Sequence, residues 1–150
     1  MISQDRYRAE DSVLAQFLPR TSYRFENIYS NKPVLKITYV TRNRAAYVLY
    51  FDLSEFPNRK PKVYVMKMMY DKNGRPMDGI SGTNHTLESW NGWTQLCHYS
   101  DSLWKPNVTL MHVYIKCAAW LEIYQTHLRT GHNIGDILAH QQSHVAYYGA

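Results

Sequence analysis

Apolar and polar positions follow two different periods along this chain, and the changes of period mark out its elements. In residues 4–18 the apolar side chains recur at helical spacing, Ser3 precedes them as an N-cap, and Pro19 ends the pattern. We therefore predict an amphipathic helix over residues 4–18. The side chains of its apolar face are Tyr7, Val13, Leu14, Phe17 and Leu18.

Four runs of β character follow this helix. They are rich in aromatic and β-branched residues, and turn-forming residues separate them. Strands that lie so close together in sequence most simply form an antiparallel meander. The predicted strands cover residues 23–29, 34–41, 46–52 and 63–69.

No clear period appears in residues 75–96, where glycines are frequent, so we predict a long irregular segment of the functional or mobile kind. Helical spacing returns at Val108 and continues to Leu128, with Gly131 as a stop signal. A short helix is predicted over residues 134–144. The whole pattern predicts an α+β fold, in which an N-terminal helix, a four-stranded antiparallel meander, a loop, a long central helix and a short C-terminal helix follow one another. The helices are expected on one face of the sheet.

Composition limits the class of protein. A chain of 150 residues with 45% apolar side chains forms a hydrophobic core as one domain, residues 1–150. Its two cysteines provide no disulfide framework, and no secretory leader or membrane span is evident, so we expect a cytoplasmic protein without a membrane partner. The net charge of +5 is scattered along the sequence, which favours an acidic protein partner over a nucleic acid.

The two cysteines occur in different settings. Cys117 falls on the apolar stripe of the long helix, where a free thiol acts as a small hydrophobic group. Cys97 lies in a predicted loop, seven residues before Trp104 and the start of that helix. A thiol held at the surface in this way can carry an acyl group as a thioester.

Two motifs around Cys97 carry a resemblance to a known family. Residues 56–63 are similar to the Tyr-Pro-x-x-Pro-Pro-x-Val motif that ubiquitin-conjugating (UBC) enzymes have between their third and fourth strands. After their active cysteine, these enzymes have Trp-x-Pro-x-x-Thr-Leu at the start of the long helix. The resemblance covers residues 8–128, and the matching motif residues are Phe56, Pro57, Pro61, Trp104, Pro106, Thr109 and Leu110.

The chain departs from the family at the His-Pro-Asn motif, because His85 is followed by Thr86 and Leu87. The segment before Cys97 is also longer than in the eukaryotic enzymes. In these respects the chain looks like the short bacterial relatives of CBASS-type antiphage defence operons. This resemblance implies a UBC-like fold and a thioester on Cys97. It also implies transfer of the C-terminus of a cGAS-like nucleotidyltransferase, or of a ubiquitin-like protein, to an amine or other nucleophile.

The sequence has no Gly-x-x-x-x-Gly-Lys-Ser/Thr loop, so we expect no bound ATP and no cofactor. If ATP-dependent activation is needed, a separate activating enzyme must supply it. His140 and His144 have the i, i+4 spacing of helical metal ligands, but no third ligand is evident, and we predict no metal site.

The other candidate residues have competing interpretations. Asn91, or else Asn84, is a candidate donor to the oxyanion, although Asn91 before Gly92 is equally typical of a turn. His98 is a candidate for lowering the pKa of the thiol or acting as a base, or else its side chain points away from its neighbour Cys97 in the loop. His85 is expected to order the loop main chain. Asp101 is a candidate for orienting or deprotonating the incoming amine, or else a polar loop residue.

Two further hypotheses remain open at this stage. The chain could be a non-catalytic UBC-like binding module, as the incomplete His-Pro-Asn motif suggests. It could also be a thiol hydrolase that uses Cys97 with a distant histidine and transfers the acyl group to water.

Overall fold

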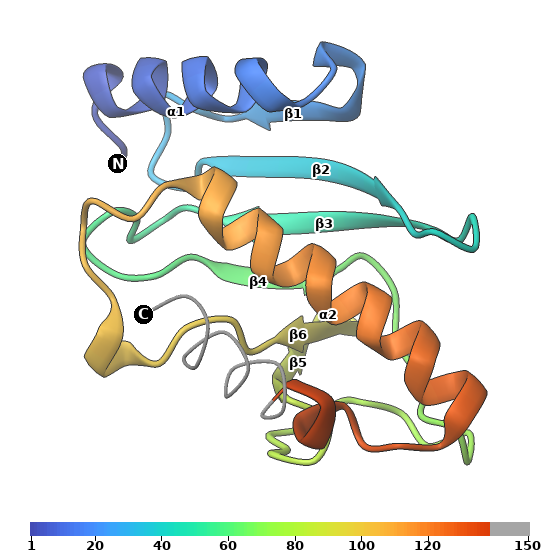
Figure 1. Cartoon of the computed structure of the whole chain (residues 1–150). Helices are drawn as coiled ribbons and strands as arrows, with labels where there is room; N and C mark the ends of the chain where they lie inside the picture. The colour runs from blue at the N-terminus through green and yellow to red at the C-terminus, as the bar shows by residue number, and fades with distance from the viewer. Residues whose placement is uncertain (139–150) are drawn as a thin grey trace, which may run out of the picture.

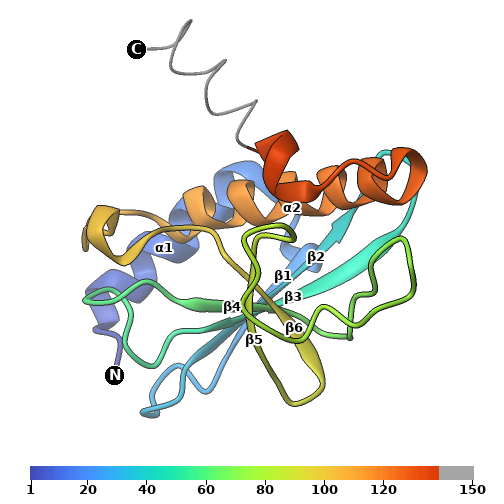
Figure 2. The ribbon, with the colours of Figure 1, turned by 90° about the horizontal axis from the view of Figure 1, so that it is seen from below.

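The computed structural model describes residues 1–138, in which two long helices lie on one face of an antiparallel sheet (Figure 1 and Figure 2). Residues 134–138 form a short helical segment, and the rest of the helix predicted over residues 134–144 lies outside the described residues, with His140 and His144. The helices are α1 (Gln4–Phe17), η1 (Arg20–Ser22), η2 (Asp101–Leu103) and α2 (Leu110–Thr130). The strands are β1 (Tyr23–Glu26), β2 (Val34–Val40), β3 (Ala46–Asp52), β4 (Lys62–Val65), β5 (Thr86–Trp90) and β6 (Trp93–Leu96).

The predicted α+β class is confirmed, but the prediction of four strands is wrong. The sheet of the described chain has six strands in the order β1-β2-β3-β4-β6-β5, and every neighbouring pair is antiparallel. Strands β1 to β4 form the predicted meander. Strands β5 and β6 add a hairpin to it, with β6 beside β4 (Figure 1).

This hairpin corrects the prediction that residues 75–96 are irregular throughout. Asn91 and Gly92 have φ values of 57° and 73°, which suit a two-residue hairpin turn, and Trp90 pairs with Trp93 across it. Between β4 and β5 the described chain has only isolated bridges, which join Tyr70 to Pro76 and residue 81 to the start of β5. The irregular segment is therefore shorter than predicted.

Helix α1 begins where the sequence predicts, because the Ser3 hydroxyl accepts a hydrogen bond from the Arg6 main-chain N–H at 3.1 Å. Its buried face differs from the prediction. Leu14 is buried, but Phe17 is 64% exposed, and the carboxylate of Glu10 takes a buried place instead. Glu10 accepts hydrogen bonds from the Leu110 N–H (2.6 Å) and from the side chain of Arg6 (3.0 Å), so it joins α1 to the start of α2.

Helix α2 begins at Leu110, two residues after the predicted start of helical spacing at Val108, and it ends at the predicted stop signal. The Thr109 hydroxyl accepts from the His112 N–H at 3.1 Å, and Gly131 ends the helix with φ of 79°. The buried stripe of α2 includes Cys117 and Trp120, and it packs over the inner face of the sheet. The main strand residues of this core are Leu35, Ile37, Leu49, Phe51, Val63, Val65 and Leu96.

Within residues 1–138, no helix is both long and apolar enough to cross a bilayer. The same residues contain no cluster of three or more His, Cys, Asp or Glu side chains able to hold a metal ion.

Candidate active site around Cys97

Cys97 directly follows β6, and its side chain is half-buried. Its main-chain N–H donates to the carbonyl oxygen of His85 at 3.2 Å, and the Nδ1 of His85 lies 2.9 Å from the carbonyl oxygen of Cys97. Because a carbonyl oxygen only accepts, this Nδ1 carries the proton and donates. His85 thus holds the main chain of Cys97 through two hydrogen bonds, in line with its predicted loop-ordering role.

The segment that begins at Cys97 is also held on its other side, by the residues that precede β4. Nε2 of His98 donates to the carbonyl oxygen of Pro61 at 2.7 Å, and Nζ of Lys60 donates to the carbonyl oxygen of Tyr99. Residues 97–99 therefore lie between two supports that come from distant parts of the sequence. This arrangement fixes the main chain around the thiol while the thiol itself remains partly accessible.

His98 does not have the electrostatic role that the sequence suggested. Burial lowers its pKa to about 4, and the positive charges of Lys60 and Lys116 act in the same direction. The imidazole is therefore neutral at physiological pH and offers no positive charge to the Cys97 thiol. Its Nε2–H is bonded to Pro61, and its buried Nδ1 has no hydrogen-bond partner among the described residues. The contact with Pro61 gives His98 an anchoring role in the loop.

The Tyr99 ring makes a second set of contacts, with α2 and with Trp104, which directly follows η2. The Lys116 Nζ is 3.7 Å from the centre of the Tyr99 ring, a close cation–π contact, and burial lowers the pKa of Lys116. The rings of Trp104 and His112 meet the Tyr99 ring edge to face, at centroid distances of 5.5 and 5.9 Å. Tyr99 thus joins the thiol segment to the long helix.

The two motifs that carried the family resemblance are in contact with each other. Nε1 of Trp104 donates to the carbonyl oxygen of Pro57 at 2.9 Å, and the Trp104 ring packs against Phe56, whose side chain is buried. The Phe56–Pro57 peptide bond is cis. Arg6 lies over the Phe56 ring and donates to the carbonyl oxygen of Pro106. These residues form a support beneath the thiol loop and do not themselves contact the thiol segment through side-chain hydrogen bonds.

Asp101 lies at the first position of η2, on the solvent side of this support. Its side chain is 92% exposed, and Oδ1 is 3.5 Å from Nζ of Lys60. A cavity of about 420 Å³ separates this part of η2 from residues 58–60 and is lined by Asn58, Arg59, Lys60, Asp101 and Trp104. Asp101 is therefore accessible to a group that approaches from solvent, beside the ammonium group of Lys60.

Asn91 is not brought to Cys97. It occupies the turn at the opposite end of the β5–β6 hairpin, and the five steps of extended chain from Gly92 to Cys97 span about 17 Å. The prediction of Asn91 as an oxyanion donor is wrong, and its interpretation as a turn residue is confirmed. Asn84 is nearer, because it precedes His85, and its carbonyl oxygen accepts from Nε1 of Trp120 at 3.0 Å.

Sequence reasoning missed the two lysines that hold Tyr99. Lys60 stands at a position where the family motif has proline, which is a weak signal for a special role. Lys116 has no sequence signal, because its contact with Tyr99 exists only once α2 is packed beside the loop.

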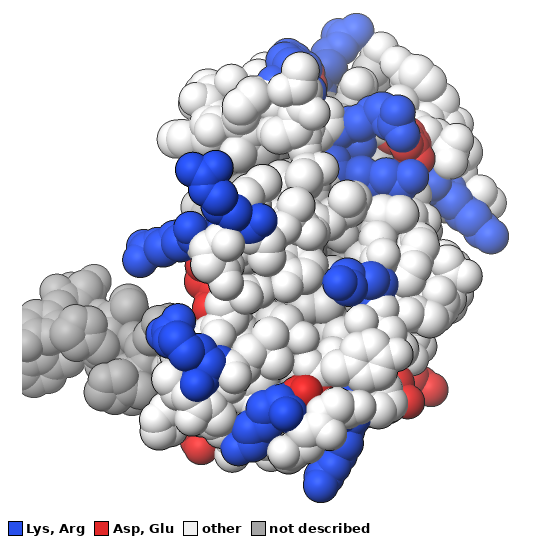
Figure 3. Space-filling model, turned by 90° about the vertical axis from the view of Figure 1, so that its right-hand side faces the viewer, with Lys and Arg blue, Asp and Glu red and all other residues white. Residues whose placement is uncertain are grey.

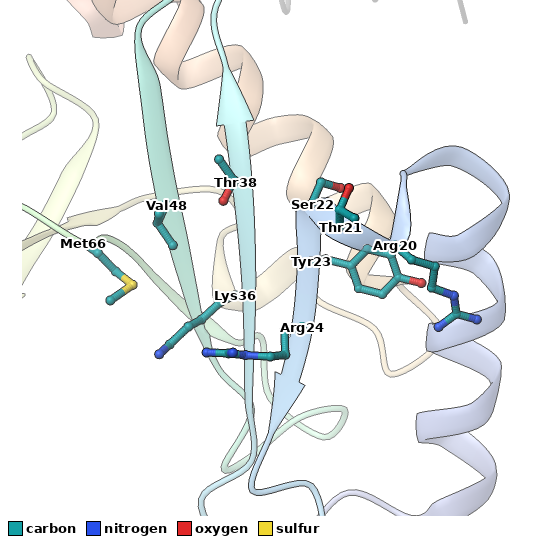
Figure 4. A pocket seen from close by; sticks show the side chains of 9 residues that line it. All are labelled: Arg20, Thr21, Ser22, Tyr23, Arg24, Lys36, Thr38, Val48 and Met66. Atoms are coloured by element: carbon teal, nitrogen blue, oxygen red, sulfur yellow. The ribbon is translucent and has the colours of Figure 1, made fainter.

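The larger hollows of the surface lie away from Cys97. One of about 610 Å³ extends over η1, strands β1 to β3 and Met66, which follows β4, and Figure 4 shows its lining side chains. The Arg24 and Lys36 cations in it both pair with Glu26, which offsets their charge. Figure 3 shows Lys and Arg side chains spread over the end of the molecule with a few carboxylates between them, and no single basic stripe.

Searches against family models, curated proteins and solved structures give no match to this chain.

Proposed function

We propose that this protein is a cysteine-dependent acyltransferase of the ubiquitin-conjugating type. It accepts the C-terminus of a partner protein as a thioester on Cys97 and passes it to an amine or another nucleophile. The observation that carries the proposal is the half-buried Cys97 on a segment whose main chain is held by His85 on one side and by Lys60 and His98 on the other.

The surrounding architecture supports the same proposal. An N-terminal helix, an antiparallel meander, a thiol after the last strand and a long helix follow one another in the order of the UBC fold. The contact between Trp104 and Pro57 joins the two motifs that resemble those of the family. We propose that this arrangement is UBC-like, with the β5–β6 hairpin as an addition to the four-stranded meander.

The transfer has two steps. The Cys97 thiolate attacks the activated acyl carbon of the donor, and the leaving group of the donor departs. An amine then attacks the thioester, the tetrahedral oxyanion collapses, the C–S bond breaks, and the amine proton is lost. His85 positions the thiol segment in both steps, and Asp101 orients the amine or accepts its proton.

Asn84 takes the place of Asn91 as the candidate donor to the oxyanion. It adjoins His85, whereas Asn91 lies at the far end of the hairpin. One well-placed donor stabilises such an intermediate by about 3 kcal/mol.

The proposed partners are those of the CBASS-type relatives. The donor is the C-terminus of a cGAS-like nucleotidyltransferase or of a ubiquitin-like protein, activated by a separate ATP-dependent enzyme where activation is required. The setting would be antiphage defence in the bacterial cytoplasm. The net charge of +5 suits an acidic protein partner.

The test is to incubate the protein with the products of its neighbouring genes and ATP, followed by electrophoresis without reducing agent. We expect an adduct that thiols release from the parent protein. The Cys97→Ser variant should give a thiol-resistant ester, and Cys97→Ala should give none. Cys117→Ser is the matched control and should behave like the parent. An adduct that persists in Cys97→Ala would exclude the proposal.

The position of Asn91 favours one alternative, a non-catalytic UBC-like module that binds the same partners. This alternative predicts a complex with the partner protein and no thiol-sensitive adduct in the same experiment. A thiol hydrolase would need a histidine that a carboxylate or amide side chain orients. His85 and His98 each use a ring nitrogen to bond a main-chain carbonyl oxygen instead, and this arrangement does not favour the hydrolase.

A further inference from the structure

Lys62 begins β4, and Cys97 directly follows the neighbouring strand β6. Strands β4 and β6 pair Val63 with Leu96 and Tyr64 with Gln95. The same register, carried one residue further, places Lys62 opposite Cys97. Directly opposite residues of antiparallel strands have their Cβ atoms about 5 Å apart.

The helices cover one face of the sheet and leave the other face open (Figure 2). Val63 and Leu96 have exposures of 0% and 1%, since they face the core under α2. Successive side chains of a strand point to opposite faces, so Lys62 points away from that core. The same alternation, carried one residue past the end of β6, gives Cys97 the outer side as well. Lys62 lines an open cavity of about 280 Å³ on this outer face, together with Tyr50, Tyr64 and Trp90.

Lys62 is also the available amine near Cys97. Lys60 donates to Tyr99 and lies near Asp101, and Lys116 lies on the Tyr99 ring, so these two ammonium groups are engaged. Lys62 is exposed and makes no ion pair or side-chain hydrogen bond within residues 1–138. Its flexible stem is long enough to span the gap between neighbouring strands.

We infer that Lys62 is an intramolecular acceptor, which takes the acyl group from Cys97 when no other nucleophile does. This inference rests on the proposed thioester at Cys97. The neutral amine of Lys62 attacks the thioester carbon, a C–N bond forms, the C–S bond breaks, and the amine proton goes to the departing thiolate. The products are an isopeptide on Lys62 and a free Cys97 thiol.

The consequence is a self-limiting enzyme. The acyl peptide remains attached on the outer face beside Cys97, over the cavity that Lys62 lines. The Lys62 amine and the Cys97 thioester belong to the same molecule, so the effective concentration of the amine at the thioester is high. Transfer to Lys62 therefore competes with transfer to an acceptor from solution.

A synthetic peptide α-thioester with a C-terminal glycine and a mercaptoethanesulfonate leaving group tests the inference without the natural donor. We expect the peptide to appear first on Cys97 as a thiol-labile adduct and then on Lys62 as a thiol-resistant one, both located by mass spectrometry. Lys62→Arg keeps the charge and removes the nucleophile, and it should lower the yield of thiol-resistant adduct by about ten-fold or more. Lys105→Arg is the matched control, because the side chain of Lys105 has no part in holding the thiol segment, and it should leave the Lys62 adduct unchanged.

The possible failures are distinguishable. If Cys97 does not accept the peptide, the result contradicts both the proposed function and the role of Lys62. If Cys97 is acylated but the peptide does not migrate, the result contradicts only the role of Lys62. The same holds if the peptide migrates equally to Lys60, Lys116 or Lys105. A Lys62 adduct of equal yield in Cys97→Ala would show direct aminolysis and would also overturn the inference.

Discussion

At the scale of single residues, the two cysteines show how burial separates a reactive thiol from a packing group. Cys117 has an exposure of 1%, and burial raises its pKa, because a thiolate in the apolar core would lack solvation. Cys97 is half-buried at the end of a strand. We predict that iodoacetamide alkylates Cys97 in the folded protein at least about ten-fold faster than Cys117.

Peptide mass spectrometry after short exposure to the reagent measures both rates. In denaturant the two rates should become similar, because both thiols are then solvated. A folded protein in which Cys97 resists the reagent as Cys117 does would remove the basis for a thioester on Cys97.

His98 makes the stability of the fold depend on pH. Its pKa is about 4 in the folded protein and about 6.5 in the unfolded chain, because burial disfavours the charged imidazolium. Between these values the unfolded chain binds a proton that the folded protein does not, so stability is lost as the pH falls from about 6.5 to 4. The contribution of His98 to this loss is on the order of 3 kcal/mol.

Urea unfolding of the parent protein and of His98→Asn at several pH values measures this contribution. The free energy of unfolding of the parent should fall more steeply between pH 6.5 and 4 than that of the variant. Parallel curves for the two proteins would show that His98 is not held neutral by its surroundings.

At the scale of elements, the helices and strands that could be predicted are those whose start, end or alternation is encoded by neighbouring residues. Residues 46–52 were predicted as a strand and are β3, and α2 has its predicted end signal at Gly131. The β5–β6 hairpin was not predicted, because a glycine-rich irregular segment precedes it and because Asn91 was considered first as a donor to the oxyanion. The pair of Trp90 and Trp93 around an Asn-Gly turn was the signal that could have revealed it.

The candidate site was predictable to a similar degree. Cys97, Trp104 and Pro57 were found because their motifs are contiguous in sequence. The sequence did not reveal the neutral state of His98 or the contact of Lys116 with Tyr99. Both depend on burial between segments that are distant in sequence.

The turn of the hairpin gives a prediction at this scale. Gly92 has φ of 73° and open space around it, so an alanine there is strained by its backbone alone. We predict that Gly92→Ala lowers the free energy of unfolding by about 1 kcal/mol. Gly79→Ala is the matched control, because Gly79 has equally open space and no positive φ, and it should cost less. Thermal or urea unfolding distinguishes the two, and equal costs would contradict the argument.

At the scale of the whole molecule, a chain of contacts joins the segment after α2 to the thiol. Gly135 donates its N–H to the carbonyl oxygen of Thr83 at 2.8 Å, and Trp120 on α2 donates to the carbonyl oxygen of Asn84. The next residue is His85, which holds the main chain of Cys97. The position of the thiol therefore depends on the packing of residues 134–138 as well as on the sheet.

Gly135→Ala tests this dependence. A methyl group at Gly135 would overlap the carbonyl oxygen of Gly82, so residues 82–84 or the segment 134–138 must shift. We predict a loss of about 1–3 kcal/mol of stability and faster hydrogen exchange of the amides around His85 and Cys97. Gly82→Ala, whose methyl group would meet nothing within 4 Å, is the matched control and should leave this exchange unchanged. If Gly135→Ala speeds exchange only in residues 134–138 and leaves Cys97 as protected as in the parent, the C-terminal segment does not help to position the thiol.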